Sequence, residues 1–305
     1  MPRLSRRDFL LSSAAAGLRA ALPAGPARAA QIRTKVIPAT GEAIPAIGMG
    51  TWITFNVGDD IKARNQRTEV LRNFFAQGGG MIDSSPMYGS SEEVIGYGLD
   101  KLGQQPGLFS ATKVWTPFGD DAADQVATSE RLWGVKPIDL MQIHNLVSWE
   151  AHMETLLEMK AQGRIRYIGV TTSHGRRLDE LERVMETQPI DFVQLTYNVV
   201  DRWAEDRLLP LARERGLAVI ANRPFRRGAL FDRYQSKPLP DWISEFDATN
   251  WAQFFLKFII SHPALTCAIP ATTRVDHMLE NMGALHGRLP DPEMRQRMAA
   301  YVESL

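Results

Sequence analysis

Four residues of types that perform acid–base chemistry stand at or just after the ends of apolar segments. Asp83, Lys113 and His144 each end such a segment, and Tyr88 follows Asp83 by five residues. Taken singly, the aspartate could cap a helix, the lysine could be a solvated surface charge, and the histidine could be a core residue with its hydrogen bonds satisfied. Three ionisable groups that interrupt neighbouring apolar segments at the same level are hard to explain in that way. The set therefore predicts a functional site.

Carbonyl reduction by hydride transfer needs such a set of groups. As hydride reaches the carbonyl carbon, negative charge develops on the oxygen, and a proton donor must stand beside it. Tyr88 is the candidate donor, although the ordinary pKa of a phenol, about 10, makes it a weak acid at neutral pH. A buried Lys113 ammonium would lower that pKa, and Asp83 would keep the lysine charged. His144 would orient the substrate carbonyl.

The elements that must position these residues are short apolar segments separated by stretches with helical periodicity. Leu178, Leu181, Val184 and Met185, for example, are spaced to cover one face of a helix. Eight segments are candidate strands: residues 46–50, 81–83, 109–113, 138–144, 165–170, 192–195, 217–221 and 266–269. Eight strands that alternate with helices predict a single α/β domain, a (β/α)8 TIM barrel. Reactive residues of such a barrel lie at the carboxyl ends of its strands, where the four candidates fall.

A doubly wound open sheet is the alternative architecture. No Gly-x-Gly-x-x-Gly follows the first strand, and the glycine run 78–80 precedes a strand, as a helix-ending turn would. Residues 35–44 form two short strands around a turn at 40–42, which predicts an N-terminal β-hairpin. We assign residues 30–305 to one barrel domain. Its longest irregular stretch, 223–249, is expected to cover a ligand.

The first 29 residues have the features of an export signal. Arg6 and Arg7 form a twin-arginine pattern, and an Ala-rich stretch over 10–22 follows. We expect residues 1–29 to be a twin-arginine signal peptide, removed after about Ala29, that engages the twin-arginine machinery and directs the folded protein to the periplasm. An amphipathic helix or an uncleaved anchor is the alternative, but the apolar run is too short for stable membrane insertion.

The amino-acid composition limits the kinds of binding partner that the protein is expected to have. The chain has 35 basic and 35 acidic residues and a formal net charge of zero, which gives no reason to expect a nucleic acid or an anionic membrane as partner. Its one cysteine, Cys267, excludes an internal disulfide and sits in an apolar stretch, where an inert buried thiol is expected. No His/Cys/Asp/Glu cluster has metal-ligand spacing, so we expect no metal.

The segment around Asp83 and Tyr88 resembles the aldo/keto reductase family. Residues 82–92 are similar to that family's Asp-Thr-Ala-x-x-Tyr-Gly-x-Ser-Glu segment, 112–114 to its lysine strand and 143–144 to its histidine strand. The match continues in order through Gly50-Thr51-Trp52, Gly169-Val170, Val193-Gln194, Tyr197-Asn198, Ile269-Pro270 and Glu280-Asn281. By this resemblance Asp83, Tyr88, Lys113 and His144 correspond to the catalytic tetrad, and the hairpin corresponds to one that plugs the bottom of the barrel.

The resemblance also implies a nicotinamide cofactor. Gln194 matches the residue that binds the carboxamide, and the segment from Thr272 to Asn281 matches the adenosine end of the site. Thr272 or Thr273 could cap the last barrel helix, whose N-terminus would favour an anion. Arg274 could meet a 2′-phosphate or be a solvated arginine, and we expect NADP(H), with NAD(H) possible. The expected cofactor-binding residues are Gly50, Thr51, Trp52, Asp83, Thr171, Thr172, Gln194, Asn222, Arg223, Pro224, Phe225, Arg227, Gly228, Thr272, Thr273, Arg274, Glu280 and Asn281.

Two positions depart from the family pattern on the nicotinamide side. Thr171 and Thr172 stand where a Ser-Asn pair is usual, and Asn222 replaces the aromatic residue that usually stacks on the nicotinamide. Arg223, Arg226 and Arg227 could compensate by binding pyrophosphate, or they could be surface charges.

The expected activity is NADPH-dependent reduction of an aldehyde or ketone, a small-molecule carbonyl substrate. Trp52, Trp115 and Phe118 are predicted to line an apolar substrate pocket, although plain packing would also suit them. The altered nicotinamide contacts leave two alternatives. One is a cofactor-binding regulatory or partner subunit, similar to the barrel subunits of ion channels. The other is an enzyme that uses a retained cofactor on a substrate without a carbonyl.

Overall fold

The computed structural model of the protein describes residues 32–305. The predicted twin-arginine signal and its cleavage site lie outside the described residues. The first described elements are two short antiparallel strands, β1 (Thr34–Val36) and β2 (Ala43–Pro45), which form the expected hairpin.

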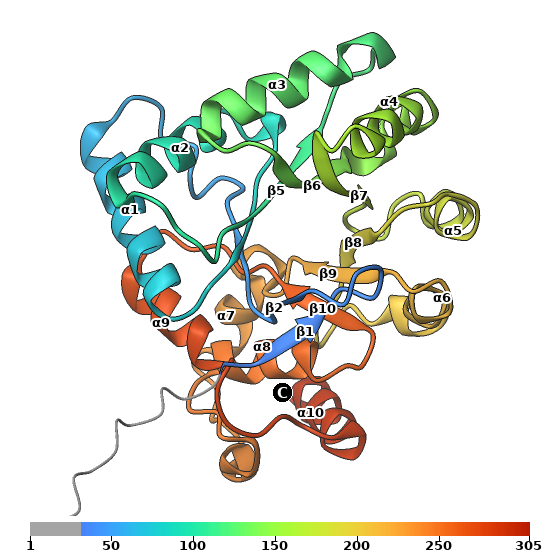
Figure 1. Cartoon of the computed structure of the whole chain (residues 1–305). Helices are drawn as coiled ribbons and strands as arrows, with labels where there is room; N and C mark the ends of the chain where they lie inside the picture. The colour runs from blue at the N-terminus through green and yellow to red at the C-terminus, as the bar shows by residue number, and fades with distance from the viewer. Residues whose placement is uncertain (1–31) are drawn as a thin grey trace, which may run out of the picture. The chain divides into compact units, whose positions relative to one another are not determined.

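Eight parallel strands follow and form a barrel with the helices on its outside (Figure 1). The strands are β3 (Met49–Gly50), β4 (Met81–Asp83), β5 (Phe109–Val114), β6 (Ile138–Ile143), β7 (Ile165–Thr171), β8 (Phe192–Thr196), β9 (Ala218–Asn222) and β10 (Leu265–Ala268). Each strand pairs with the strand that precedes or follows it in the sequence. The two ends of the sheet meet where Ile47 forms a parallel bridge with Ala268. The predicted (β/α)8 barrel is therefore confirmed, and the open-sheet alternative is excluded.

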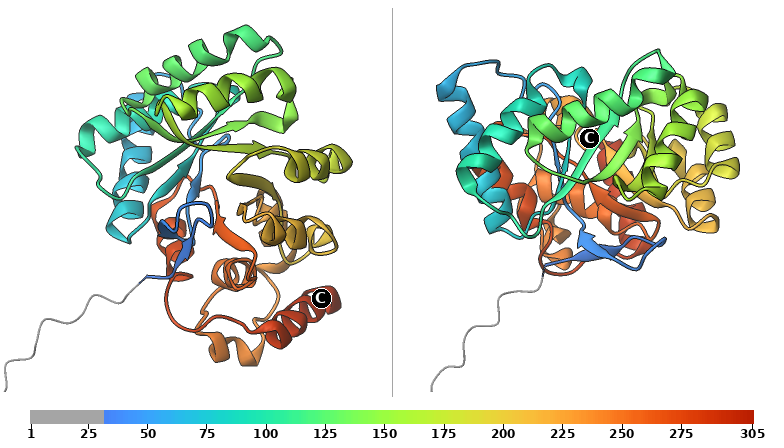
Figure 2. Two further views of the ribbon diagram at one scale, coloured as in Figure 1. Left: turned by 45° about the vertical axis from the view of Figure 1, so that its right-hand side comes forward. Right: turned by 45° about the horizontal axis from the view of Figure 1, so that its top comes forward.

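Helices connect the strands and cover the outside of the barrel (Figure 2). They are α1 (Ile61–Ala76), α2 (Ser91–Leu102), α3 (Ala122–Trp133), α4 (Trp149–Ala161), α5 (Leu178–Thr187), α6 (Leu208–Glu214), α7 (Ala229–Tyr234), α8 (Trp251–Ile260), α9 (Val275–Gly283) and α10 (Pro292–Ser304). Side chains with helical spacing face the strands, as Leu181, Val184 and Met185 of α5 do, and they are fully buried. Burial of this apolar face stabilises the helices more than their intrinsic propensity does.

The hairpin closes one end of the barrel interior. Ile37 and Ile44 belong to the same buried cluster as Phe109, Tyr167 and Phe192, whose side chains fill the inside of the barrel. In the right-hand view of Figure 2 the blue hairpin lies across this end. In the described part of the chain, the plug leaves the opposite end, at the carboxyl ends of the strands, open to a ligand.

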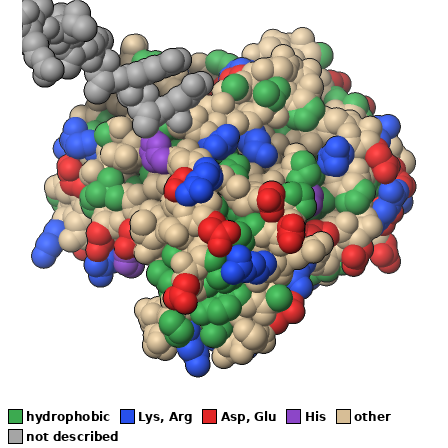
Figure 3. All heavy atoms as spheres, turned by 90° about the horizontal axis from the view of Figure 1, so that it is seen from below, with side chains coloured by type: hydrophobic (Ala, Val, Ile, Leu, Met, Phe, Trp, Pro, Cys, Tyr) green, Lys and Arg blue, Asp and Glu red, His purple; other side chains and the backbone are tan. Residues whose placement is uncertain are grey.

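Cys267 is also inside the barrel and fully buried, and this burial raises the pKa of its thiol. The thiol is therefore inert at neutral pH, as the sequence predicts. On the outer surface shown in Figure 3, basic and acidic side chains are interspersed with hydrophobic ones. Within residues 32–305, no helix is both long and apolar enough to cross a membrane.

The stretch 223–249 is more regular than the sequence suggests. It contains α7 and two 3-10 helices, η5 (Arg226–Gly228) and η6 (Asp241–Phe246). Most of its aromatic side chains pack against α8, as Phe231 does against Phe255 at a ring-centroid distance of 6.0 Å. The prediction of a long irregular loop was wrong, because these aromatics build a local core.

Candidate active site

A cavity of about 780 Å³ opens at the carboxyl ends of the strands. Its volume is in the range of small-molecule sites. The loops after β3, β4, β6, β7 and β9 all contribute to its wall, as do the ends of β4, β7, β8 and β9. In the described part of the chain, no group of three His, Cys, Asp or Glu side chains is placed to hold a metal ion.

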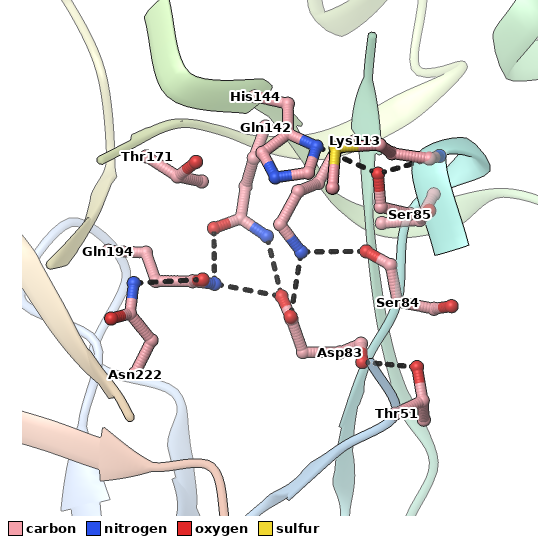
Figure 4. A network of polar contacts seen from close by, with 12 residues as sticks. Thr51, Asp83, Ser84, Ser85, Lys113, Gln142, His144, Thr171, Gln194 and Asn222 are labelled. Atoms are coloured by element: carbon pink, nitrogen blue, oxygen red, sulfur yellow. Dashed lines mark hydrogen bonds and ion pairs between the residues drawn. The ribbon is translucent and has the colours of Figure 1, made fainter. Parts of the chain in front are cut away.

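Asp83 is the centre of the polar network at the base of this cavity (Figure 4). Its Oδ2 accepts a hydrogen bond from Lys113 Nζ at 2.7 Å. Its Oδ1 accepts from Gln142 Nε2 at 2.9 Å and from Gln194 Nε2 at 2.8 Å. Lys113 also donates to the carbonyl of Ser84 at 2.7 Å. Burial lowers the pKa of the Lys113 ammonium, and the Asp83 carboxylate opposes that shift. Neither charge is left without a partner.

Tyr88 lies beside this ion pair. Lys113 Nζ is 5.3 Å from the centroid of the Tyr88 ring. The sequence predicts that this ammonium lowers the pKa of the phenol, but the opposite holds: burial raises that pKa, and the Asp83 charge raises it further. The reason is that removing a phenolate charge from water costs more than the Lys113 ammonium, 5.3 Å from the ring and itself paired with Asp83, can offset. Tyr88 is therefore fully protonated at neutral pH.

The rings of His144 and Tyr88 form a T-shaped pair, with their centroids 5.7 Å apart. Its Nδ1 shares a hydrogen bond with Ser85 Oγ at 2.9 Å. Burial, and then the nearby Lys113 charge, lower the pKa of the imidazole to about 3. His144 is thus a neutral imidazole at physiological pH, and its Nε2 has no hydrogen-bond partner between residues 32 and 305.

The nicotinamide side of the predicted site lies across the cavity, on β7, β8 and β9. Asn222 donates through Nδ2 to the Thr172 carbonyl at 2.9 Å, and its Oδ1 accepts from Thr196 Oγ1 at 2.7 Å. Thr171 Oγ1 accepts from the backbone N–H of Asn145 at 3.0 Å. Thr172 Oγ1 is buried and has no partner among the described residues. Asn222 is therefore a structural part of the rim, while one threonine hydroxyl beside the cavity remains available.

The predicted adenosine-end residues do not line the cavity. Thr273, Arg274 and Glu280 are exposed on or just before α9, whereas Thr272 and Asn281 are buried there. The Thr272 hydroxyl accepts from the backbone N–H of Arg274, which is itself the N-cap residue of α9. The prediction that Thr272 or Thr273 caps this helix was therefore wrong. Arg274 pairs with Asp276 in full contact with solvent.

The three arginines after β9 have different surroundings. Arg226 pairs with Asp201 at 3.0 Å and does not line the cavity. Arg223 and Arg227 both line it, and the Arg227 guanidinium lies 3.8 Å from the centroid of the Trp52 ring. The surface-charge interpretation therefore fits Arg226, and the ligand-binding interpretation fits the other two.

Of the three aromatics predicted to line a substrate pocket, the structure brings only Trp52 to the cavity. Trp115 and Phe118 are 44% and 67% exposed and are not part of its wall. Gln125 accepts from the backbone N–H of Trp115 and donates to its carbonyl, which fixes this loop to α3. Apolar lining comes instead from residues that the sequence did not single out, such as Ile53.

Gln142, Ser85 and Glu92 were not among the predicted site residues. Gln142 is two residues before His144, on the same face of β6, and strand periodicity is the signal that could have found it. Ser85 bonds His144, which no spacing rule reveals. Glu92 is buried and accepts from Thr112 Oγ1 at 2.6 Å, which fixes α2 to the strand that bears Lys113.

Left-handed backbone conformations gather at this rim. Ten described non-glycine residues have positive φ, and nine of them lie in loops that follow barrel strands. They are Ile53 after β3, Asn145, Leu146 and Ser148 after β6, His174 and Arg177 after β7, and Arg223, Arg226 and Arg227 after β9. Such conformations are unfavourable for L-residues and concentrate at functional sites. The strained loops thus coincide with the cavity.

A parallel barrel with a buried lysine–aspartate pair, a protonated tyrosine and a neutral histidine at its open end defines a class of oxidoreductase. The chain belongs to the aldo/keto reductase family, whose model matches residues 46–301. It is similar to methylglyoxal reductase YeaE of Escherichia coli, with 27% identity over 276 residues that cover 88% of this chain and 96% of that protein. Aldo-keto reductase str7 of Strobilurus tenacellus is 28% identical over 276 residues, covering 77% and 80%.

Solved structures show the same relationship. An aldo-keto reductase from Klebsiella pneumoniae in complex with NADPH superposes with a TM-score of 0.73 and 25% identity, covering 89% of this chain and 96% of that one. The thermostable aldo-keto reductase Tm1743, in complex with the inhibitor epalrestat, gives a TM-score of 0.70 and 28% identity over 88% and 99%. The chain is therefore an oxidoreductase of the aldo/keto reductase type.

Proposed function

We propose that the protein reduces an aldehyde or ketone with NADPH and that Tyr88 donates the proton. The observation that carries this proposal is the buried Lys113–Asp83 pair beneath a protonated Tyr88, next to a neutral His144. These are the groups that a carbonyl oxygen needs when it gains negative charge.

The cavity suits a nicotinamide at its inner end. Thr172 Oγ1 is buried and has no partner between residues 32 and 305, and such a hydroxyl can satisfy a carboxamide. Gln194 and Asn222 carry further amide groups within hydrogen-bond reach of each other, at 3.4 Å. When bound there, NADPH would supply the hydride for the carbonyl carbon.

The rest of the cofactor would follow the rim towards α9. The loop 224–228 would hold the phosphates, with Arg227 as the main cation, because guanidinium pairs well with phosphate oxygens. Thr272, Thr273, Glu280 and Asn281 would surround the adenosine. Arg274 would meet the 2′-phosphate, since its exposed pair with Asp276 is weak enough to exchange. This charge, and the NADPH found in a solved relative, favour NADP(H) over NAD(H).

The chain's own residues handle the proton. Tyr88 transfers its hydroxyl proton to the carbonyl oxygen, which becomes the alcohol oxygen. Lys113 stabilises the phenolate that is left, and Asp83 keeps Lys113 in place. With Ser85 Oγ as donor to Nδ1, His144 carries its hydrogen on Nε2 and can donate it to the same oxygen.

The test is NADPH consumption by the purified protein over a broad panel of aldehydes and ketones. We expect Tyr88→Phe to reduce kcat/KM by roughly 100- to 10,000-fold, the range for loss of a general acid. Tyr97→Phe is the matched control, because Tyr97 lies on α2 and its hydroxyl bonds Asn65 at the surface. The absence of NADPH-dependent turnover, with no difference between Tyr88→Phe and the unmodified protein, would refute the proposal.

A cofactor-binding partner subunit is the second candidate. The observation that favours it is Asn222, which places a small polar group where the family has a stacking aromatic. Tight NADPH binding without turnover on any carbonyl, together with co-purification of a membrane protein, would support this candidate over the enzyme.

We also propose that residues 1–29 direct export through the twin-arginine pathway to the periplasm, on the strength of Arg6 and Arg7. Replacement of both arginines by lysine should retain the full-length protein in the cytoplasm in cell fractionation. Arg3→Lys is the control and should leave export unchanged. Equal periplasmic amounts of all three proteins would contradict this proposal.

A further inference from the structure

One wall of the cavity carries more positive charge than the described residues neutralise. This cationic wall consists of two arginines, Arg176 in the loop after β7 and Arg223 directly after β9, with the neutral imidazole of His174 beside them. All three line the cavity. The carboxylate in the same cavity, Asp83, is already paired with Lys113.

The two guanidiniums of the wall have no acidic partner in the described structure. Arg223 Nη1 is buried and makes no hydrogen bond to residues 32–305, although a buried guanidinium nitrogen is normally paired. Arg176 forms no ion pair within the same residues. The neighbouring Arg177 differs, because it bonds Glu180 and the carbonyls of Asn145 and Leu146.

The arginine charges at this wall lie close enough together to repel one another and to disfavour a charge on His174. Burial lowers the pKa of His174, and the charges of Arg223, Arg227 and Arg176 lower it further. Burial likewise lowers the pKa of Arg223, with contributions from Arg227, Arg226 and Arg176. Asp201 opposes these charges, but its carboxylate is held by Arg226 and Asn198. A bound anion would remove this repulsion.

The backbone at two of these residues adopts an energetically unfavourable conformation. His174 and Arg223 have φ of 65° and 52°, in the left-handed region that L-residues seldom adopt. Neither position is a glycine, and ordinary right-handed or extended backbone would aim both side chains elsewhere. Retention of this conformation at two residues that face one cavity is typical of a ligand-binding site.

The wall adjoins the reacting groups and is distinct from the arginine assigned to the cofactor phosphates. Arg177 ties the loop after β7 to the segment His144–Leu146 through hydrogen bonds of 2.9 and 2.6 Å to its carbonyls. Arg227 instead reaches towards the β3 side and lies on Trp52. A substrate held by His144 could therefore extend to Arg176 without displacing the cofactor.

We propose that the substrate of this protein carries an anionic group, a carboxylate or a phosphate ester, besides its carbonyl, and that Arg176 and Arg223 bind that group. This inference rests on the proposed carbonyl reduction. Arginine forms paired hydrogen bonds with both kinds of anion, so the wall recognises their shared chemistry.

The test compares three aldehydes that differ at one position: 4-formylbenzoate, its methyl ester and 4-formylphenyl phosphate. We expect kcat/KM for at least one anion to exceed that for the ester by roughly tenfold or more, the usual strength of a charge-assisted hydrogen bond. The anion with the larger ratio identifies the group. In Arg176→Gln this ratio should fall towards one, while the Kd of NADPH stays as in the unmodified protein. Arg131→Gln, which removes an exposed charge on α3, should keep the ratio.

A binding measurement distinguishes failure of the cationic wall from failure of the proposed carbonyl reduction. Isothermal titration calorimetry with 4-formylbenzoate, in the presence of NADP⁺, reports binding even if no turnover occurs. Turnover of the ester with no preference for either anion would refute the cationic wall and leave the reductase proposal intact. An Arg176→Gln variant that binds NADPH more weakly but keeps its anion preference would also refute it, because the wall would then belong to the cofactor.

Discussion

The two sides of the cavity differ in how completely their polar groups are paired. On the β4–β6 side, Asp83, Lys113 and Gln142 satisfy one another with hydrogen bonds of 2.7 to 2.9 Å. On the β7–β9 side, Thr172 Oγ1 and Arg223 Nη1 are buried without partners in the described chain. The first side is organised by the protein alone, which suits groups that move a proton in every turnover. The second side keeps unpaired groups among the described residues, which suits a wall whose partners are ligands.

The largest effect is expected on the organised side. Lys113→Met should lower kcat/KM by at least about 100-fold, because the phenolate of Tyr88 loses its stabilising cation. It should also reduce the free energy of unfolding by roughly 3–5 kcal/mol, because Asp83 stays buried without a counter-charge. Steady-state kinetics and denaturant titration measure the two effects. Lys101→Met on α2 is the control, and a Lys113→Met enzyme with near-normal activity would show that the pair is only structural.

A smaller effect is expected on the ligand-dependent side. Asn222→Ala removes the bonds to the Thr172 carbonyl and to Thr196 Oγ1, and leaves both groups unsatisfied. At about 1–3 kcal/mol for such a loss, NADPH should bind roughly 5- to 100-fold more weakly. Fluorescence titration gives the Kd, with Asn73→Ala on the surface of α1 as the control. An unchanged Kd would mean that Asn222 does not organise the nicotinamide end.

The pH dependence of stability tests the neutral state of His144. Its pKa in the folded protein is lowered to about 3, so between that pH and its ordinary value of 6.5 the unfolded chain binds more protons. The stabilisation is complete above pH 6.5 and is lost as the pH falls towards 3. Unfolding curves of His144→Asn should show a weaker fall over this window. His262, whose pKa is lowered to about 4, adds its own share, and His262→Asn serves as the comparison.

The smallest effect on activity is expected for residues that lie outside the cavity wall. Phe118→Ala should change kcat/KM and stability little, within about 0.5 kcal/mol, because its ring is exposed and outside the cavity wall. Trp52→Ala should instead raise KM, since Trp52 lines the cavity under Arg227. A tenfold loss of kcat/KM in Phe118→Ala would place this loop over the substrate after all.

The features of the site that local sequence patterns determine could be predicted, and those that depend on distant residues could not. Strand periodicity and order predict the barrel and bring Asp83, Lys113 and His144 to one rim, because the carboxyl ends of parallel strands coincide. The same periodicity puts Gln142 on the face of His144, but its partner Asp83 is on another strand. The direction of the Tyr88 pKa shift depends on how deeply the phenol is buried and on how close it lies to Asp83, which only the three-dimensional structure reveals.

Loop side chains were the least predictable. Trp115 lies outside the cavity wall, and Gln125, ten residues later, holds its backbone. The cationic wall depends on left-handed conformations at His174 and Arg223, positions where the sequence contains no glycine to signal them. Arg226 and Arg227 are neighbours in sequence, yet one pairs with Asp201 and the other lies on Trp52.

The most direct test of the central claim follows the hydride itself. The protein is incubated with an aldehyde and NADPH deuterated at C4 of the nicotinamide, and the alcohol product is analysed by mass spectrometry. The account predicts deuterium on the former carbonyl carbon and a solvent hydrogen on the oxygen, with little product from Tyr88→Phe. Alcohol without deuterium from either face of the labelled cofactor, or equal product from Tyr88→Phe, would contradict it.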